Sequence, residues 1–140
     1  MNPKELLALA AKARERSYSP YSGFRVGAAL LAASGKVYLG CNIENAAYTP
    51  TNCAERTAFF KAISEGEREF VSVAVVGGKN GISEPAYPCG VCRQVMAEFC
   101  DPESFRILLG AGTDETQEFR LKELLPFGFG PGDLKEECEG

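Results

Sequence analysis

Cysteines and one glutamate near two expected helix starts have the types and spacing of a catalytic metal site. Cys89 and Cys92 lie three apart at the start of one expected helix, which puts both sulfurs on one helix face. Cys53 begins another expected helix, and Glu55 follows it two residues later. Because the positive ends of two helix dipoles favour thiolate over thiol, the three sulfurs can converge on one ion. A zinc ion held by three sulfurs keeps its fourth tetrahedral position open for water.

The chemistry of such a site is acid–base hydrolysis. Zinc lowers the pKa of its bound water, and Glu55 is close enough to a ligand in sequence to take the proton without binding the metal itself. The chain contains no histidine, which excludes Ser-His and Cys-His nucleophile pairs and every imidazole-ligated metal site. Proton transfer must therefore use carboxylates, tyrosine, lysine or metal-bound water.

Length and charge narrow the protein class. A chain of 140 residues fits a single domain, here residues 1–140, with an acidic tail from about 135 that we expect to be mobile. The net charge of −4 disfavours a nucleic-acid polymer as partner.

The apolar run 6–11 is flanked closely by charges, so it is typical of an amphipathic helix rather than an export signal. No uninterrupted apolar stretch is long enough to span a membrane. We therefore expect a cytoplasmic protein with reduced thiols.

The pattern along the chain predicts alternating helices and strands around the cysteines. Helices are expected at about 3–16, 53–64 and 89–100, and strands at 25–32, 36–41, 70–76, 105–110 and 117–121. The first two strands should form a hairpin across Ser34-Gly35, and 124–126 should end a terminal helical turn. This order predicts a three-layer α/β/α sandwich with a mixed five-stranded sheet.

Zinc deaminases carry a two-part signature, in which Cys-x-Glu or His-x-Glu is followed further along the chain by Pro-Cys-x-x-Cys. This chain matches it with Cys53-Ala54-Glu55 and Pro88-Cys89-Gly90-Val91-Cys92. Together with it, the segments 18–30, 40–48, 53–58 and 88–94 resemble the small, homotetrameric cytidine deaminases. The resemblance runs from Glu5 to about Leu134, and a cysteine before Ala54 separates the chain from deaminases that carry His-x-Glu. It implies a cytidine deaminase-like fold with one zinc per chain. The implied activity is hydrolytic deamination of cytidine and 2′-deoxycytidine to the uridine nucleosides and ammonia, in pyrimidine salvage.

The resemblance also implies roles at the metal. Cys53, Cys89 and Cys92 would bind zinc, and Glu55 would be the catalytic proton shuttle. The backbone N–H of Ala54 would hold the pyrimidine carbonyl.

Further roles concern the substrate and the charge of the site. Phe24 would pack on the base, where the alternative is an ordinary core phenylalanine. By the same resemblance, Asn42 and Glu44 would bind the ribose 3′-hydroxyl. On an extended segment both would face the same way, since alternate residues share a face. The alternative for this pair is a solvated strand edge. Arg56 would donate hydrogen bonds to the thiolates and offset their negative charge, unless it forms an ordinary surface ion pair.

The family completes each pocket across the subunits of a homotetramer. In this chain, Ala46, Tyr48 and a phenylalanine of the segment 127–129 would enter a neighbour's pocket. Spacing favours Phe129 over Phe127.

Two alternatives remain for the cysteines. Cys89 and Cys92 could form a thiol–disulfide redox pair at a helix N-terminus. Alternatively, Cys41 or Cys100 could complete a closed, purely structural zinc site.

Glu55 also has a structural alternative, since Asn52 could begin a capping box in which Glu55 is the third helical residue. At the level of the whole protein, two other functions stay open. One is deamination of another aminated pyrimidine nucleoside analogue, and the other is a non-catalytic, zinc-stabilised binding module.

Overall fold

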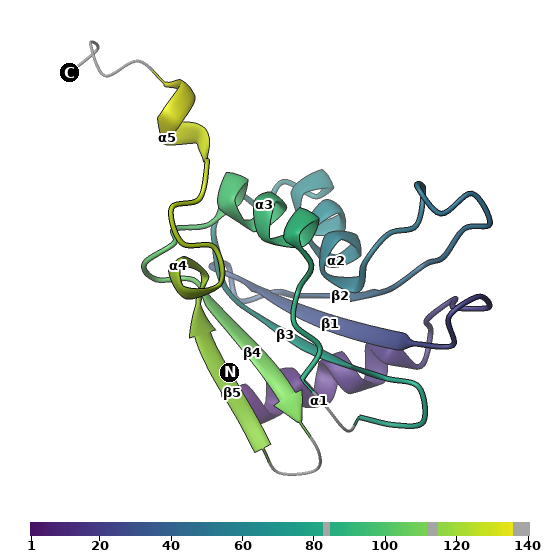
Figure 1. Cartoon of the computed structure of the whole chain (residues 1–140). Coiled ribbons are helices and arrows are strands. Elements are labelled where there is room, and N and C mark those ends of the chain that lie inside the picture. The colour runs from purple at the N-terminus through teal and green to yellow at the C-terminus, as the bar shows by residue number, and fades with distance from the viewer. Residues whose placement is uncertain (83–84, 112–114, 136–140) are drawn as a thin grey trace.

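The computed structural model describes residues 1–82, 85–111 and 115–135. Its strands form one five-stranded sheet in the order β2-β1-β3-β4-β5 (Figure 1). The strands are β1 (Arg25–Ala32), β2 (Val37–Cys41), β3 (Phe70–Gly78), β4 (Arg106–Ala111) and β5 (Glu115–Arg120). Only β3 and β4 pair in parallel, and the other neighbours are antiparallel. The predicted mixed five-stranded sheet and its first hairpin are confirmed.

Helices cover both faces of the sheet, as predicted. The helices are α1 (Pro3–Arg14), α2 (Ala54–Ser64), α3 (Gly90–Phe99), α4 (Leu121–Leu124) and α5 (Pro131–Leu134). α1 lies on one face, while α2 and α3 lie on the other (Figure 1). Among the described helices, none is long and apolar enough to cross a membrane.

Alternate residues of β3 enter two separate cores. Val73 and Val75 pack with Phe59 of α2 and Phe105 on one face, whereas Ala74 packs with α1 on the other. Because helices cover both faces of the sheet, residues 72–78 of β3 are all buried, and all of them except Ser72 are apolar. The sheet is therefore the middle layer of the domain, with one apolar core on each side.

The chain direction brings three connections to one edge of the sheet. β2 and β3 are both antiparallel to β1, so they run the same way and end at the same edge. The register pairs Gly27 with Cys41 and Arg25 with Gly78, which places the residues before β1, after β2 and after β3 together. α2 and α3 begin from the loops that leave this edge. The helix starts that carry the predicted metal ligands therefore meet here.

The first turn of α2 lies directly on β2 because position 40 has no side chain. A Cβ atom at Gly40 would lie 2.4 Å from the carbonyl oxygen of Ala54 and 2.6 Å from the backbone nitrogen of Ala58. These distances are far shorter than a van der Waals contact. Gly40 thus allows the helix that carries Glu55 to sit against the strand that leads to Asn42.

Candidate active site

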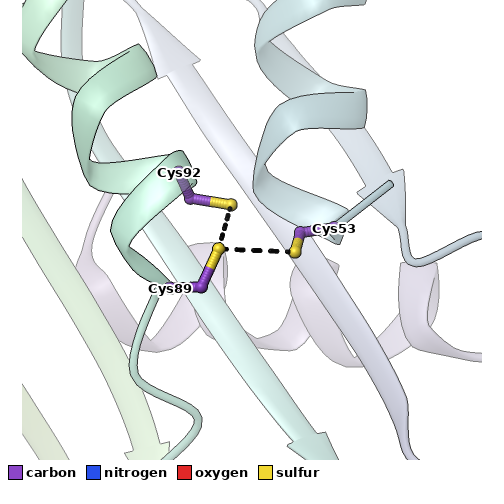
Figure 2. A group of neighbouring side chains, drawn as sticks. All are labelled: Cys53, Cys89 and Cys92. Carbon is purple, nitrogen blue, oxygen red and sulfur yellow. Dashed lines mark hydrogen bonds between the residues drawn. The ribbon is translucent and has the colours of Figure 1, made fainter. Parts of the chain in front are cut away.

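The three predicted zinc ligands converge at the starts of α2 and α3. Cys53 and Cys89 are the N-cap residues of the two helices, and Cys92 lies in the first turn of α3. The Sγ of Cys89 lies 3.7 Å from that of Cys53 and 3.5 Å from that of Cys92, and the side chains point toward one another (Figure 2). Sulfurs around a tetrahedral zinc at Zn–S of about 2.3 Å stand roughly 3.8 Å apart. The cluster therefore fits a zinc ion.

Positive charge beside the cluster favours thiolate at Cys53. Nη2 of Arg56 donates a hydrogen bond to Cys53 Sγ at 3.2 Å. The Cys92 thiol and the Arg56 guanidinium lower the pKa of Cys53 to about 5, even though burial acts in the opposite direction. In the described part of the chain, Arg56 forms no ion pair with a carboxylate. The contacts of Arg56 are thus those of a residue that offsets thiolate charge.

Glu55 is a buried carboxyl group beside the thiols. Its side chain is only 4% exposed, and burial, followed by the negative charge of Cys53, raises its pKa to about 7. The N-cap of α2 is Cys53, and the amide of Asn52 donates instead to Thr57 Oγ1 at 3.1 Å. Asn52 therefore does not begin a capping box with Glu55. A carboxyl group with a pKa near neutrality is suited to taking up and returning a proton.

A cavity of about 340 Å³ opens beside the thiols. It brings together most of the residues that the sequence singled out within one chain: Phe24, Asn42, Cys53, Ala54, Glu55 and Cys89. It is also lined by residues that the sequence analysis missed: Val26, Thr51, Asn52, Pro85, Ala86 and Tyr87. Apolar walls with a few convergent polar groups are typical of small-molecule sites.

Asn42 is held by its neighbours in one orientation. Its Oδ1 accepts from the backbone N–H of Val26 at 2.9 Å and from the Ser17 hydroxyl. Its Nδ2 donates to the carbonyl oxygen of Phe24 at 2.8 Å. Because an amide oxygen accepts two hydrogen bonds and an amide nitrogen donates two, one N–H of Asn42 remains free.

Glu44 is held by the turn that precedes β1. Its Oε1 accepts from the backbone N–H groups of Tyr21 at 2.9 Å and Ser22 at 3.1 Å, and its Oε2 accepts from the Ser22 hydroxyl. The Ser22 hydroxyl lowers the pKa of Glu44, so this group is a carboxylate at neutral pH. One acceptor position of Oε2 is left, since a carboxylate offers about four. Glu44 itself is not among the residues that line the cavity.

The residues expected to act across subunits lie away from this chain's own cavity. Tyr48 is 76% exposed, Phe129 is 56% exposed, and Ala46 is also exposed. Phe127 is fully exposed as well. The backbone carbonyl of Phe129 accepts a hydrogen bond from the Gln94 side chain at 2.7 Å, which fixes this part of the C-terminal arm to α3.

The other described cysteines lie outside the cluster. Cys41 donates to the carbonyl oxygen of Arg16, and Cys100 is buried in the core under α3. Neither belongs to the described group of metal-binding side chains, so the closed four-cysteine site is not formed there. Cys53 beside Cys89 and Cys92 gives a three-thiol group, which favours metal binding over a two-cysteine redox pair.

Comparisons with known proteins agree on one family. Residues 1–107 match the family model for the cytidine and deoxycytidylate deaminase zinc-binding region. A cytidine deaminase from Sporosarcina psychrophila is 51% identical over 139 residues, which cover 99% of each chain. One from Halalkalibacterium halodurans is 50% identical over 97% of this chain and 100% of its own length. The crystal structure of cytidine deaminase from Burkholderia pseudomallei superposes with a TM-score of 0.85 at 45% identity, covering 92% of this chain and 100% of that chain.

Proposed function

Because the chain belongs to the cytidine and deoxycytidylate deaminase family, we propose that its three-thiol cavity carries out the zinc-dependent hydrolytic deamination of cytidine. The products are uridine and ammonia. One observation carries the assignment of the site: Cys53, Cys89 and Cys92 converge beside the buried carboxyl group of Glu55 on one cavity. 2′-Deoxycytidine is accepted as well, because the 3′-hydroxyl expected to bind Asn42 and Glu44 is common to both nucleosides.

The residues around the thiols then have distinct tasks. Cys53, Cys89 and Cys92 hold one zinc ion, which supplies Lewis-acid activation of water when it is bound. Glu55 takes the two protons of the attacking water in turn, and passes the first to the ring nitrogen and the second to the leaving amine. The backbone N–H of Ala54, at the start of α2, holds the pyrimidine carbonyl.

Recognition of the nucleoside rests on Phe24 and Asn42, which line the cavity, and on Glu44, which lies outside its lining. Phe24 packs on the base from the start of β1. The free N–H of Asn42 and the free acceptor position of Glu44 amount to one donor and one acceptor. A hydroxyl group can satisfy both, since it accepts and donates. This pairing supports binding of one ribose hydroxyl, which we assign as the 3′-hydroxyl.

The direct test of this function is the loss of cytidine absorbance on adding purified protein, with the zinc content measured in the same samples. We expect turnover with about one zinc per chain and loss of turnover after chelation. Consumption of another aminated pyrimidine nucleoside, with cytidine left intact, would favour the related deaminase activity. Zinc-containing protein that consumes neither would favour a binding module.

We infer a cytoplasmic location from the state of the thiols. The five described cysteines are all free, although three of the sulfurs lie close together. A reducing compartment keeps such thiols available for metal.

The exposed aromatic side chains support a homotetramer with shared pockets. A single chain leaves Tyr48 and Phe129 largely in solvent, and Phe129 is carried by an arm that Gln94 fixes to α3. Exposed aromatics of this kind are typical of residues buried in an interface. In the tetramer, Ala46, Tyr48 and Phe129 would enter pockets of neighbouring subunits.

Phe129→Ala is expected to raise KM for cytidine by up to about tenfold, because a lost aromatic contact costs roughly 0.5–1.5 kcal/mol. Zinc content should stay near that of the parent. Phe127→Ala is the matched control, since Phe127 is also exposed but is not assigned to the pocket, and its KM should be unchanged. Light scattering should give a mass near four times the 15.1 kDa of one chain. A monomer with full activity at the assay concentration would refute pocket sharing.

A further inference from the structure

The Ser22 hydroxyl connects two residues of the substrate site. It donates a hydrogen bond to Oε2 of Glu44 and accepts one from the backbone N–H of Phe24 at 2.9 Å. Its single proton and an acceptor position are therefore both used. Glu44 and Phe24 come from different segments of the chain, and this one side chain links them.

The rest of the Glu44 carboxylate is bound by the same turn. Oε1 accepts from the backbone N–H groups of Tyr21 and Ser22. The turn is closed by a hydrogen bond of 3.0 Å from Gly23 N–H to the carbonyl oxygen of Ser19, and Gly23 has φ of +70°. Among the residues that the structure describes, no lysine or arginine forms an ion pair with Glu44. Its orientation is thus set by this turn. Among the described residues, the Ser22 hydroxyl alone donates to Oε2, the oxygen that keeps a free acceptor position.

We propose that Ser22 is a positioning residue that holds Oε2 of Glu44 and the backbone of Phe24 in place, and thereby makes a free 3′-hydroxyl on the nucleoside a determinant of specificity. The inference rests on the proposed function, in which Glu44 and Asn42 bind that hydroxyl. Without the Ser22 hydroxyl, Oε2 loses the only donor that the described residues give it, and the carboxylate is held through Oε1 alone. The N–H of Phe24 loses its acceptor at the same time.

The test compares cytidine with 3′-deoxycytidine, which lacks only the hydroxyl in question. For Ser22→Ala, kcat/KM for cytidine should fall about tenfold, mostly through KM, which is the scale of one hydrogen bond to a charged group. The kcat/KM for 3′-deoxycytidine should change far less, so the ratio between the two substrates should shrink. Ser22→Thr keeps the hydroxyl and should keep the ratio of the parent.

The chain offers a matched control at the other end of the β1–β2 hairpin. The hydroxyl of Ser34 donates to Oε2 of Glu67 at 2.6 Å and accepts from the backbone N–H of Lys36, which repeats the pattern at Ser22 away from the cavity. Ser34→Ala should therefore reproduce any loss of thermal stability without changing the substrate ratio.

An equal fall of kcat/KM for both substrates in Ser22→Ala, with zinc retained, would overturn the proposal. So would a Ser22→Thr variant whose ratio between the two substrates falls well below that of the parent, a result that can be obtained even if Ser22→Ala does not fold. A parent protein that binds zinc but does not consume cytidine would instead refute the proposed function, on which this inference rests. The parent assay thus separates the two failures.

Discussion

Glu55→Gln is expected to lower turnover of cytidine at least ~10²-fold, the scale of general acid–base catalysis, while the fold and zinc content stay unchanged. The amide has nearly the size of the carboxyl group, so the buried space beside Cys53 remains filled. It cannot accept and return a proton. Turnover is measured under saturating cytidine and divided by the zinc content of each preparation.

Glu65→Gln is the matched control for this substitution. Glu65 is an exposed glutamate at the C-terminal end of the same helix, α2. It should keep the turnover of the parent, which shows that losing one carboxylate from α2 is harmless away from the cavity. Near-parental turnover in Glu55→Gln would leave Glu55 with a purely structural role.

Cys89→Ala is expected to remove most of the bound zinc and, with it, the activity. Two thiolates are a poor zinc site, and Cys89 is the sulfur that lies within 3.7 Å of both others. Zinc is measured by atomic absorption after dialysis, with about one ion per chain in the parent. Thermal unfolding reports whether Cys89→Ala still folds without zinc.

Two variants test whether the loss is specific to the ligands. Cys41→Ala removes a thiol outside the cluster and should retain zinc. Arg56→Gln keeps all three sulfurs but removes the donor to Cys53, so it should retain most zinc and lose turnover. Full zinc occupancy in Cys89→Ala would refute the ligand assignment.

The periodicity of apolar residues predicted which helices and strands form better than it predicted their first and last residues. The apolar run at β3 and the helical spacing in α2 are local signals, and both were found in the expected places. Leu121 was expected in the last strand but begins α4, because the change from strand to helix happens at Arg120 without a break in the apolar pattern. α5 was not predicted, since Pro131–Leu134 is too short to show helical periodicity.

The metal cluster was predictable because its signal is carried by residue type and local spacing. Tyr87 and Ala86 enter the cavity from the loop before α3, where sequence gives no periodic pattern. The signal that could have found them is their position just before Cys89. Ser22 is one of several serines in a turn-rich segment, and it is distinguished from Ser19 by its contacts with Glu44 and Phe24.

The close packing of α2 on Gly40 divides the cavity wall into a part that is open to redesign and a part that is not. The start of α2 packs so closely on Gly40 that even a Cβ atom there would lie 2.4 Å from the carbonyl oxygen of Ala54. This part of the wall therefore cannot move toward β2, and any shift of it would displace Cys53 and Glu55 together. Another part of the wall belongs to the loop 85–87. There Tyr87 is half exposed, and it is held by one hydrogen bond of 3.0 Å to Gln117 and by contact with the ring of Phe119. To engineer the enzyme for bulkier pyrimidine analogues, Tyr87, Gln117 and Phe119 should therefore be varied, while the start of α2 is left unchanged.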